Sequence, residues 1–308
     1  MTPRLALKVD VDTFSGTCDG VPRLLELFGR HGVLATFFFS LGPDNTGKAI
    51  KRVLKKGFVK KVLRASPGAS YGVRTMLSGT LLPARDIGAS RAAVLRMREA
   101  KAAGHECGIH AWDHVDWHDR AARMGRSELE EIVAKAQARY ADVFGESAIL
   151  SAAPGWTATP LTVEIEEARG VRVSSNTRGG APFHALRPDG LPSSTLEIPS
   201  TLPTLDELLA LDEYGSSATA RERTVGHLRE EVRTGGPHVH SLHTEIEGGR
   251  ALHPLFERQL AAWREDGVAL VTLGELAAER LVVEEPVPVK ALAWTTVPGR
   301  AIRVATQA

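Results

Sequence analysis

The 308-residue chain is 43% hydrophobic and 24% charged, an ordinary composition for a globular protein with a substantial core. Its 38 lysines and arginines nearly balance 37 aspartates and glutamates, and the formal charge of +1 suggests no polyelectrolyte partner such as a nucleic acid. The longest apolar runs fall far short of the roughly 18 to 20 residues that span a bilayer, and the N-terminus lacks the long apolar region of a secretory signal. Two cysteines, Cys18 and Cys107, lack zinc-motif spacing and cannot form a disulfide framework, so a reducing compartment is expected.

Short β-like runs alternate with helical patterns along the chain. The first strand is expected at Leu5–Val11, followed by a helix at Val21–His31 and a strand at Leu34–Phe39. Later helix and strand pairs are expected at Arg91–Ala103 with His105–His110, Ser127–Phe144 with Ala148–Ala152, Thr162–Arg169 with Val171–Ser174, Ala218–Thr234 with His238–Leu242, and Pro254–Glu265 with Val268–Thr272. About seven such repeats predict one α/β domain over residues 1–280, a single distorted (β/α) barrel of mostly parallel strands.

Two segments depart from this repeat. Residues 43–88 form an insertion far longer than the usual connection of about 2 to 6 residues, and such elaborations tend to be functional. Residues 281–308 contain three prolines and are expected to form a C-terminal tail outside the barrel repeat, with no role that the sequence assigns.

Polar clusters follow several predicted strands, at the end where a barrel of this type builds its active site. Asp10 and Asp12 close the first strand. Because side chains alternate along a strand, the two carboxylates lie on one side, where they repel each other unless a cation or a proton separates them. A solvated strand end carries the same pattern, so this pair alone indicates little.

His110 and His114 follow a middle strand and are four residues apart. They can bind one metal ion if the chain turns helically after the strand. Two surface histidines at this spacing are also common, but a nearby carboxylate would complete a set of two histidines and one aspartate that leaves positions open for water. Such a set serves metal-dependent hydrolases and also non-haem iron oxygenases, so it does not select the reaction.

Two further clusters end later strands. His243 could protonate a leaving group or could simply be a hydrogen-bonded histidine at a strand end, whereas His238 and His240 are expected to be packing or surface residues. The turn at Pro154, Gly155 and Trp156 could present backbone N–H groups and an aromatic wall to a ligand.

Taken in order, the segments VDVDTFSGT, HECGIHAWDH, SAAPGW and HTEIEG resemble the polysaccharide deacetylase (NodB-homology) family of metal-dependent amide hydrolases. The resemblance covers roughly residues 4–280, including the insertion, and leaves the tail uncovered. Within the family, the likeness is greatest to deformylases that act on a formamido-arabinose carried on a prenyl phosphate, in the pathway that adds aminoarabinose to lipid A.

The resemblance implies a role for ten residues and for one divalent metal ion, which could be zinc, manganese or cobalt. The metal ligands would be Asp12, His110 and His114, the general base Asp10, the general acid His243, and the substrate-binding residues Pro154, Gly155, Trp156, Arg178 and Glu245. The chain departs from the family at two positions: Ala152 replaces an arginine that many members place two residues before the proline, and Asn176 replaces an aspartate ahead of Arg178. Both family residues tune the charged pair, so the pKa values of Asp10 and His243 depend on what replaces them.

The net charge conceals one strongly basic segment. Residues 45–85 contain ten lysines and arginines and no acidic residue, while the rest of the chain is net acidic. Within Lys48–Arg64 the cations alternate with apolar residues as in two short basic amphipathic helices, and MLSGTLL at Met76–Leu82 adds uncharged apolar surface. This pattern favours an anionic membrane surface, with a solvated helix on the flank of the barrel as the alternative.

These observations predict a metal-dependent carbon–nitrogen hydrolase that removes a formyl group from a prenyl-phosphate-linked sugar, located in the cytoplasm and attached peripherally to the inner membrane. One alternative is a deacetylase of another N-acylated sugar or polysaccharide. The other is a non-catalytic carbohydrate-binding barrel, suggested by Ala152 and Asn176.

Overall fold

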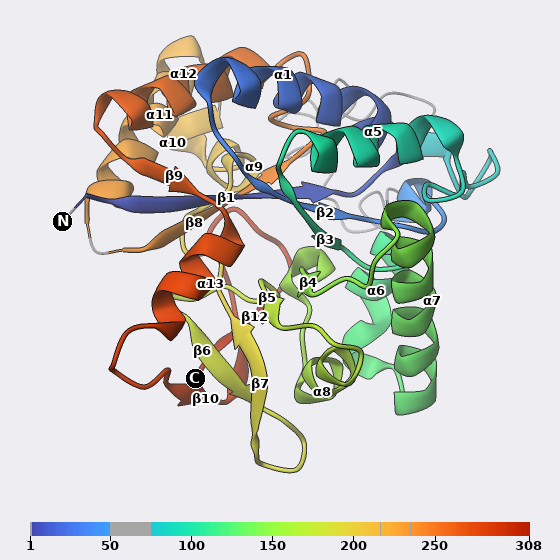
Figure 1. The fold of residues 1–308 in the computed structure, drawn as a ribbon. Helices are drawn as coiled ribbons and strands as arrows, with labels where there is room; N and C mark the ends of the chain where they lie inside the picture. Colours follow the sequence, from blue (N-terminus) through green and yellow to red (C-terminus); the bar gives the residue numbers. More distant parts are fainter. Residues whose placement is uncertain (1, 50–74, 216, 235) are drawn as a thin grey trace.

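The computed structural model describes residues 2–49, 75–215, 217–234 and 236–308. At its centre is strand β1 (Arg4–Val11), in which seven of the eight residues are buried. Its residues Lys8–Val11 pair with β2 (Thr36–Phe39), Arg4–Ala6 pair with β9 (Ala269–Val271), and Leu5–Asp10 pair with β8 (His238–His243), all in parallel. The motif that carries Asp10 and Asp12 therefore lies at the end of a strand that is paired along both of its edges (Figure 1).

In the described ranges, ten strands form one sheet with the order β10-β6-β7-β5-β4-β3-β2-β1-β8, and β9 joins at β1. The strands not yet defined are β3 (Glu106–Ile109), β4 (Leu150–Ser151), β5 (Val173–Ser174), β6 (Phe183–Leu186), β7 (Pro192–Glu197) and β10 (Val289–Lys290), and a separate hairpin comprises β11 (Leu292–Thr295) and β12 (Val304–Gln307). Among the described strands of this sheet, β6 and β7 are the one antiparallel pair. The expected distorted, mostly parallel α/β barrel is thereby confirmed.

The helices with both ends in the described ranges are α1 (Val21–His31), α5 (Arg91–Ala102), α6 (His114–Arg120), α7 (Arg126–Phe144), α8 (Pro160–Ala168), α9 (Leu205–Leu209), α10 (Asp212–Gly215), α11 (Ala218–Arg233), α12 (His253–Glu265) and α13 (Leu273–Leu281). All seven expected strands and all six expected helices are present, with ends shifted by at most two residues. The sequence patterns did not predict the short α9 and α10, α13, the β6–β7 hairpin or the tail strands β10, β11 and β12, and they indicated α6 only as the helical turn that His110 and His114 require. Short elements of this kind contain too few residues to show a period.

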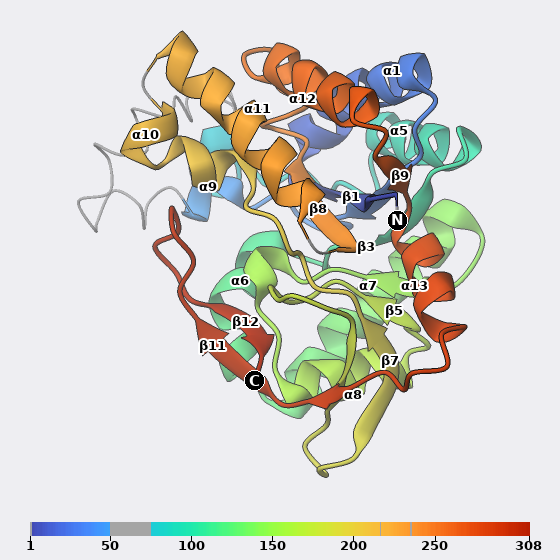
Figure 2. The same cartoon turned by 90° about the vertical axis from the view of Figure 1, so that its left-hand side faces the viewer.

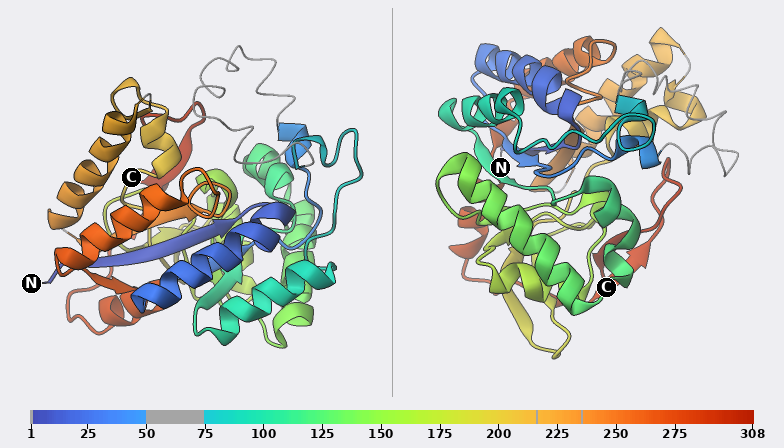
Figure 3. Two further views of the ribbon diagram at one scale, coloured as in Figure 1. Left: turned by 90° about the horizontal axis from the view of Figure 1, so that it is seen from above. Right: turned by 90° about the vertical axis from the view of Figure 1, so that its right-hand side faces the viewer.

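Alternation along β1 separates the packing core from the site. Leu5, Leu7, Val9 and Val11 pack into the largest hydrophobic cluster together with residues of α1, α5, α11 and α12. Figure 3 shows α1 and α5 lying side by side over this part of the sheet. The alternate residues Ala6, Lys8 and Asp10 face the other side, because side chains of a strand point alternately to its two faces. The polar side chains of the motif thus project into the interior of the barrel.

The described parts of the 43–88 insertion are anchored beside the loops after β1 and β3. Asp44 accepts a hydrogen bond from the Phe14 backbone N–H (3.0 Å), and Asn45 donates one to Asp113 (2.5 Å). On the returning side, the Thr75 hydroxyl lies 2.9 Å from the Ser15 hydroxyl. The basic pieces predicted for Lys48–Arg64 lie outside the described residues, except Lys48 and Ala49; of the apolar Met76–Leu82 segment, Leu81 is 78% exposed.

The C-terminal tail returns to the barrel. Its strand β10 extends the sheet at β6, and the β11–β12 hairpin reaches the loop after β5, where the Arg178 N–H donates to the Ala305 carbonyl (2.9 Å). Figure 2 shows this path from α13 past β7 and α8 to the hairpin. In the described ranges, no helix combines the length and the apolar character needed to cross a bilayer.

Candidate metal centre

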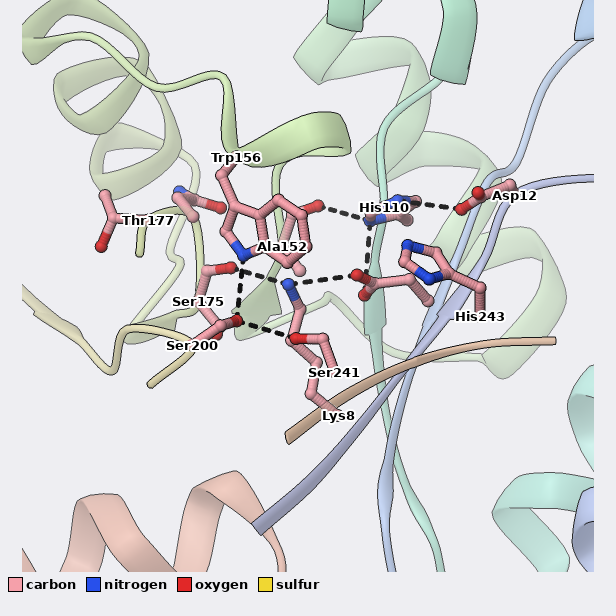
Figure 4. Close-up of polar contacts among 12 residues, drawn as sticks. Lys8, Asp12, His110, Ala152, Trp156, Ser175, Thr177, Ser200, Ser241 and His243 are labelled. Carbon is pink, nitrogen blue, oxygen red and sulfur yellow. Dashed lines mark hydrogen bonds and ion pairs between the residues drawn. The ribbon is translucent and has the colours of Figure 1, made fainter. Parts of the chain in front are cut away.

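Asp12, His110 and His114 converge as the sequence analysis proposed, with ligand atoms all within 4.8 Å of one another. Asp12 follows β1, His110 follows β3, and His114 is the first residue of α6. The Asp12 carboxylate lies 3.1 Å from His110 Nε2 and 3.5 Å from His114 Nε2. Two parallel strands and one helix start therefore bring the three side chains together. Figure 4 shows Asp12 beside His110.

Local structure orients both histidines. Asp113 caps α6 and accepts the backbone N–H groups of Val115 and Asp116, which sets the helical turn that His114 needs. His110 Nδ1 lies 2.8 Å from the Ala152 carbonyl oxygen, so Nδ1 carries the proton and Nε2 presents its lone pair toward Asp12. Ala111, the next residue, has a φ of 106°, a strained conformation for a residue with a Cβ.

These three residues fit a divalent ion. The buried Asp12 Oδ1 has no hydrogen-bond partner in the described part of the chain, as expected of an oxygen that faces an ion. Burial opposes ionisation of Asp12, but the neighbouring His114 and His110 hold the pKa of its carboxyl far below the usual range. Burial also lowers the pKa of His114. The set thus offers an ionised carboxylate and a neutral imidazole, the protonation states in which both groups bind a metal.

Asp10 lies beside this centre and contacts a buried lysine. Its Oδ1 is 3.8 Å from His110 Nδ1 and its Oδ2 is 3.2 Å from Lys8 Nζ. Lys8 is completely buried, donates a hydrogen bond to the Ser175 carbonyl (3.1 Å), and lies 5.1 Å from the Trp156 ring centroid (Figure 4). Lys8 was not among the predicted site residues, although a lysine two residues before Asp10 in an otherwise apolar strand is a signal that the sequence contains.

His243 ends β8, where the register pairs it with Asp10 of β1. Its Nδ1 lies 3.3 Å from Oδ1 of Asp206 in α9, a residue that the sequence analysis also missed. Burial disfavours a charged imidazole here, but Asp206 outweighs it and raises the pKa of His243 well above its usual value. His238 and His240 are buried packing residues, the latter 5.3 Å from the Trp263 ring.

The Pro154–Trp156 turn forms the wall behind these side chains. Gly155 has a φ of 59° and its Cα faces the His118 ring, so a Cβ at this position would collide with that ring. Trp156 is only 2% exposed and donates from Nε1 to the Ser200 hydroxyl (2.9 Å). Its indole supports the site from behind, and little of it is open to a ligand.

Arg178 and Glu245 are held by internal partners. Arg178 donates to both carboxylate oxygens of Glu207 (3.1 and 3.0 Å), and Glu245 accepts the Thr13 N–H (3.1 Å). Both side chains are buried, and their hydrogen bonds hold the loops around the site in place. Their contact with substrate stays a prediction.

The two departures from the family pattern leave no charge at the site. Ala152 contributes its backbone carbonyl to His110, and its side chain is a methyl group. The Asn176 amide donates to Glu166 (2.7 Å). The charges next to Asp10 and His243 therefore come from Lys8 and Asp206.

A mostly parallel α/β barrel with an Asp-His-His cluster at the carboxyl ends of its strands defines a class of metal-binding hydrolase folds. Residues 6–174 match the family model described as polysaccharide deacetylase. The chain belongs to this family, which confirms the resemblance.

Two relatives and one solved structure illustrate the similarity. The chain is 36% identical over 275 residues to a protein of Shewanella sediminis named 4-deoxy-4-formamido-L-arabinose-phosphoundecaprenol deformylase, covering 89% of this chain and 85% of that one. It is 28% identical over 292 residues to a protein of the same name from Wigglesworthia glossinidia brevipalpis, covering 92% and 96%. A crystal structure of a Mycobacterium smegmatis polysaccharide deacetylase superposes with a TM-score of 0.58 at 17% identity, covering 93% of this chain and 96% of that one, which shows the shared fold.

Proposed function

We propose that this protein is a metal-dependent amide hydrolase that removes the formyl group from 4-deoxy-4-formamido-L-arabinose carried on undecaprenyl phosphate. The observation that carries the proposal is the pairing of Asp10 and His243 across β1 and β8, beside the cluster of Asp12, His110 and His114. The name of the Shewanella sediminis relative supplies the substrate. The expected products are formate and the free amino sugar.

Asp12, His110 and His114 would hold the ion. When bound, a divalent ion supplies Lewis acidity for the formyl oxygen and lowers the pKa of a bound water. Asp10 Oδ1 is buried and has no hydrogen-bond partner among the described residues, so it is available to take a proton from the attacking water. The water oxygen bonds to the formyl carbon, the carbon–nitrogen bond breaks, and His243 donates its proton to the departing sugar nitrogen. The raised pKa of His243 keeps that proton in place near neutral pH.

The direct test is formate release from the purified formamido-arabinose lipid. Replacement of Asp10 by Asn should lower kcat by about 10³-fold, because general-base catalysis contributes at about that level. The matched control is Asp266→Asn. Asp266 follows α12 and forms an ion pair with Arg229 of α11, so its carboxylate takes no part in the site. Metal-loaded Asp10→Asn protein with wild-type turnover would overturn the mechanism.

An N-acetyl analogue of the same lipid tests the alternative acyl group, which the family name favours. Preference for the formyl substrate supports a deformylase. Faster release of acetate would make the protein a deacetylase with the same machinery.

We further propose that the 43–88 insertion places the site at an anionic membrane surface, on the cytoplasmic side of the inner membrane. Support comes from its ten basic residues between 45 and 85, and from its anchors on Phe14 and Asp113, which are close in sequence to the proposed metal ligands Asp12 and His114. Deletion of residues 50–74 should abolish sedimentation with phosphatidylglycerol vesicles while leaving binding of the metal intact. Unchanged sedimentation of the deletion variant would refute this membrane role.

A further inference from the structure

Two charged residues that carry no assigned role contact the catalytic pair. Lys8 lies on β1 two residues before Asp10, and Asp206 lies in the first turn of α9 beside His243. We propose that Lys8 and Asp206 are the positioning residues of this hydrolase: Lys8 fixes the carboxylate of Asp10, and Asp206 fixes the imidazole of His243. This inference rests on the proposed function and adds residues that hold its base and its acid.

The case for Lys8 starts from its burial. A lysine side chain with no exposed surface is costly unless its charge is paired, and the contact that provides the countercharge is Asp10 (Nζ to Oδ2, 3.2 Å). The Ser175 carbonyl takes a second ammonium hydrogen at 3.1 Å, and the Trp156 ring lies 5.1 Å away. These contacts direct the ammonium toward one carboxylate oxygen.

That arrangement leaves the two Asp10 oxygens in different environments. Oδ2 is held by Lys8, whereas Oδ1 is buried, lacks a hydrogen-bond partner in the described ranges, and lies on the His110 side at 3.8 Å from Nδ1. A general base needs one free oxygen aimed at the reacting water and a fixed orientation. Because Lys8 and Asp10 share one strand face, the strand itself sets their separation.

Asp206 is fixed by the start of its helix. Thr204 and Glu207 form a capping box, with the Thr204 N–H donating to Glu207 (3.0 Å) and the Glu207 N–H donating to the Thr204 hydroxyl (3.4 Å). This places the Asp206 carboxylate 3.3 Å from His243 Nδ1. The His243 backbone N–H is held separately by Glu247 at 2.8 Å.

A carboxylate at Nδ1 selects the ring tautomer. It favours the proton on Nδ1 in the neutral imidazole, so the proton that is gained and lost during turnover resides on Nε2. The Asp206 side chain is 40% exposed and that of His243 is 15% exposed, so water weakens this pair more than the buried Lys8–Asp10 pair. We therefore expect a larger loss of activity at position 8 than at position 206.

The activity test uses metal-loaded full-length protein and whichever lipid-linked amide, formyl or acetyl, the wild-type protein hydrolyses. Lys8→Met should lower kcat by about 10²-fold and Asp206→Asn by about tenfold, with KM and metal content within threefold of wild type. Lys8→Arg should recover most of the loss because it restores the cation. Lys135→Met and Asp266→Asn are the matched controls, because their ion pairs with Glu131 and Arg229 involve none of the site residues.

A structural readout separates this inference from the proposed function. In ¹⁵N NMR spectra of the wild-type protein, the His243 imidazole should be the Nδ1–H tautomer above its titration, and Asp206→Asn should redistribute it toward Nε2–H. The Lys8 ammonium signal should shift on Asp10→Asn.

Unchanged spectra in both variants would overturn the positioning roles, as would folded, metal-loaded Lys8→Met with wild-type kcat. A wild-type protein that hydrolyses neither amide would overturn the proposed function, and the NMR results would still decide the positioning roles. If Lys8→Met fails to fold, Lys8→Gln and Lys8→Arg replace it in the same comparison.

Discussion

Asp10 and His243 are direct register partners across the parallel strands β1 and β8. Paired residues on adjacent strands project to the same face of a sheet, so the candidate base and the candidate acid emerge next to each other although they lie 233 positions apart in the sequence. The metal ligands arrive from β1, β3 and α6 on the neighbouring side. The register of the parallel strands therefore sets the positions of the candidate base and acid.

We expect removal of a ligand to abolish binding of the metal. Asp12→Ala and His110→Ala should each reduce the bound ion from about one per chain to near zero, because two remaining ligands cannot hold a divalent ion tightly. Elemental analysis by mass spectrometry after dialysis measures this, and also identifies the metal. His227→Ala is the control, because His227 of α11 packs against Tyr214 of α10 and is not one of the proposed ligands. Full occupancy in Asp12→Ala protein would contradict the assigned centre.

The cap of α6 should couple stability to binding of the metal. Asp113→Ala removes the acceptor of two backbone N–H groups and should cost about 1 kcal/mol of unfolding free energy. Because His114 is the first residue of the helix, the affinity for the metal should also fall. Asp113→Ser, which keeps a capping oxygen, should recover most of the stability but not the Asn45 contact. Denaturant melts and metal titrations measure the two effects; equal affinity in all three proteins would show that the cap does not position His114.

Trp156 should contribute mainly to the free energy of unfolding and less to substrate binding. Trp156→Ala should cost about 3 to 5 kcal/mol, the usual effect of removing a buried large aromatic side chain. Trp156→Phe keeps most of the packing and loses the hydrogen bond to Ser200, so it should cost about 1 kcal/mol. Equilibrium unfolding in urea measures both. A decrease in unfolding free energy below about 1 kcal/mol for Trp156→Ala would argue against a packing role for the indole behind the site.

Buried Glu247 should make stability fall as the pH rises. Burial raises the pKa of this carboxyl from 4.5 to about 8. Between these values the unfolded chain releases the proton and the folded protein keeps it, so this group destabilises the fold progressively across that range, by at most about 1.4 kcal/mol per pH unit. Above about pH 8 its contribution becomes constant.

Glu247→Gln tests this directly, because the amide oxygen can still accept the His243 N–H. The variant should lose stability less steeply than the wild type between pH 5 and 8 in urea melts. Glu265→Gln, an exposed residue of α12, is the control with an unchanged slope. Identical slopes in the wild-type and Glu247→Gln proteins would rule out the contribution.

Local sequence patterns were sufficient for the regular part of the fold. The apolar period of Val21–His31 predicted α1 with both ends correct, since helical amphipathicity is encoded within one segment. The hairpin at β6 and β7 was missed because its second strand is the mostly polar stretch PSSTLE, in which Leu196 is the one large aliphatic side chain. The tail's pairing with β6 and with Arg178 depends on residues over 100 positions away, for which the sequence carries no local pattern.

The sequence by itself determined the family, the barrel and the residues that meet at the metal centre. The reason is that pairs such as Asp10 with Asp12 and His110 with His114 lie within a few residues of each other, so their spacing can be recognised directly in the sequence. It also showed that the usual charges were missing at Ala152 and Asn176. Only the tertiary structure decided what replaces them. Lys8 reaches Asp10 because the two share a face of β1, and Asp206 reaches His243 because α9 lies against the end of β8. The physical reason is that electrostatic partners are chosen by distance in space, and the folded sheet sets that distance.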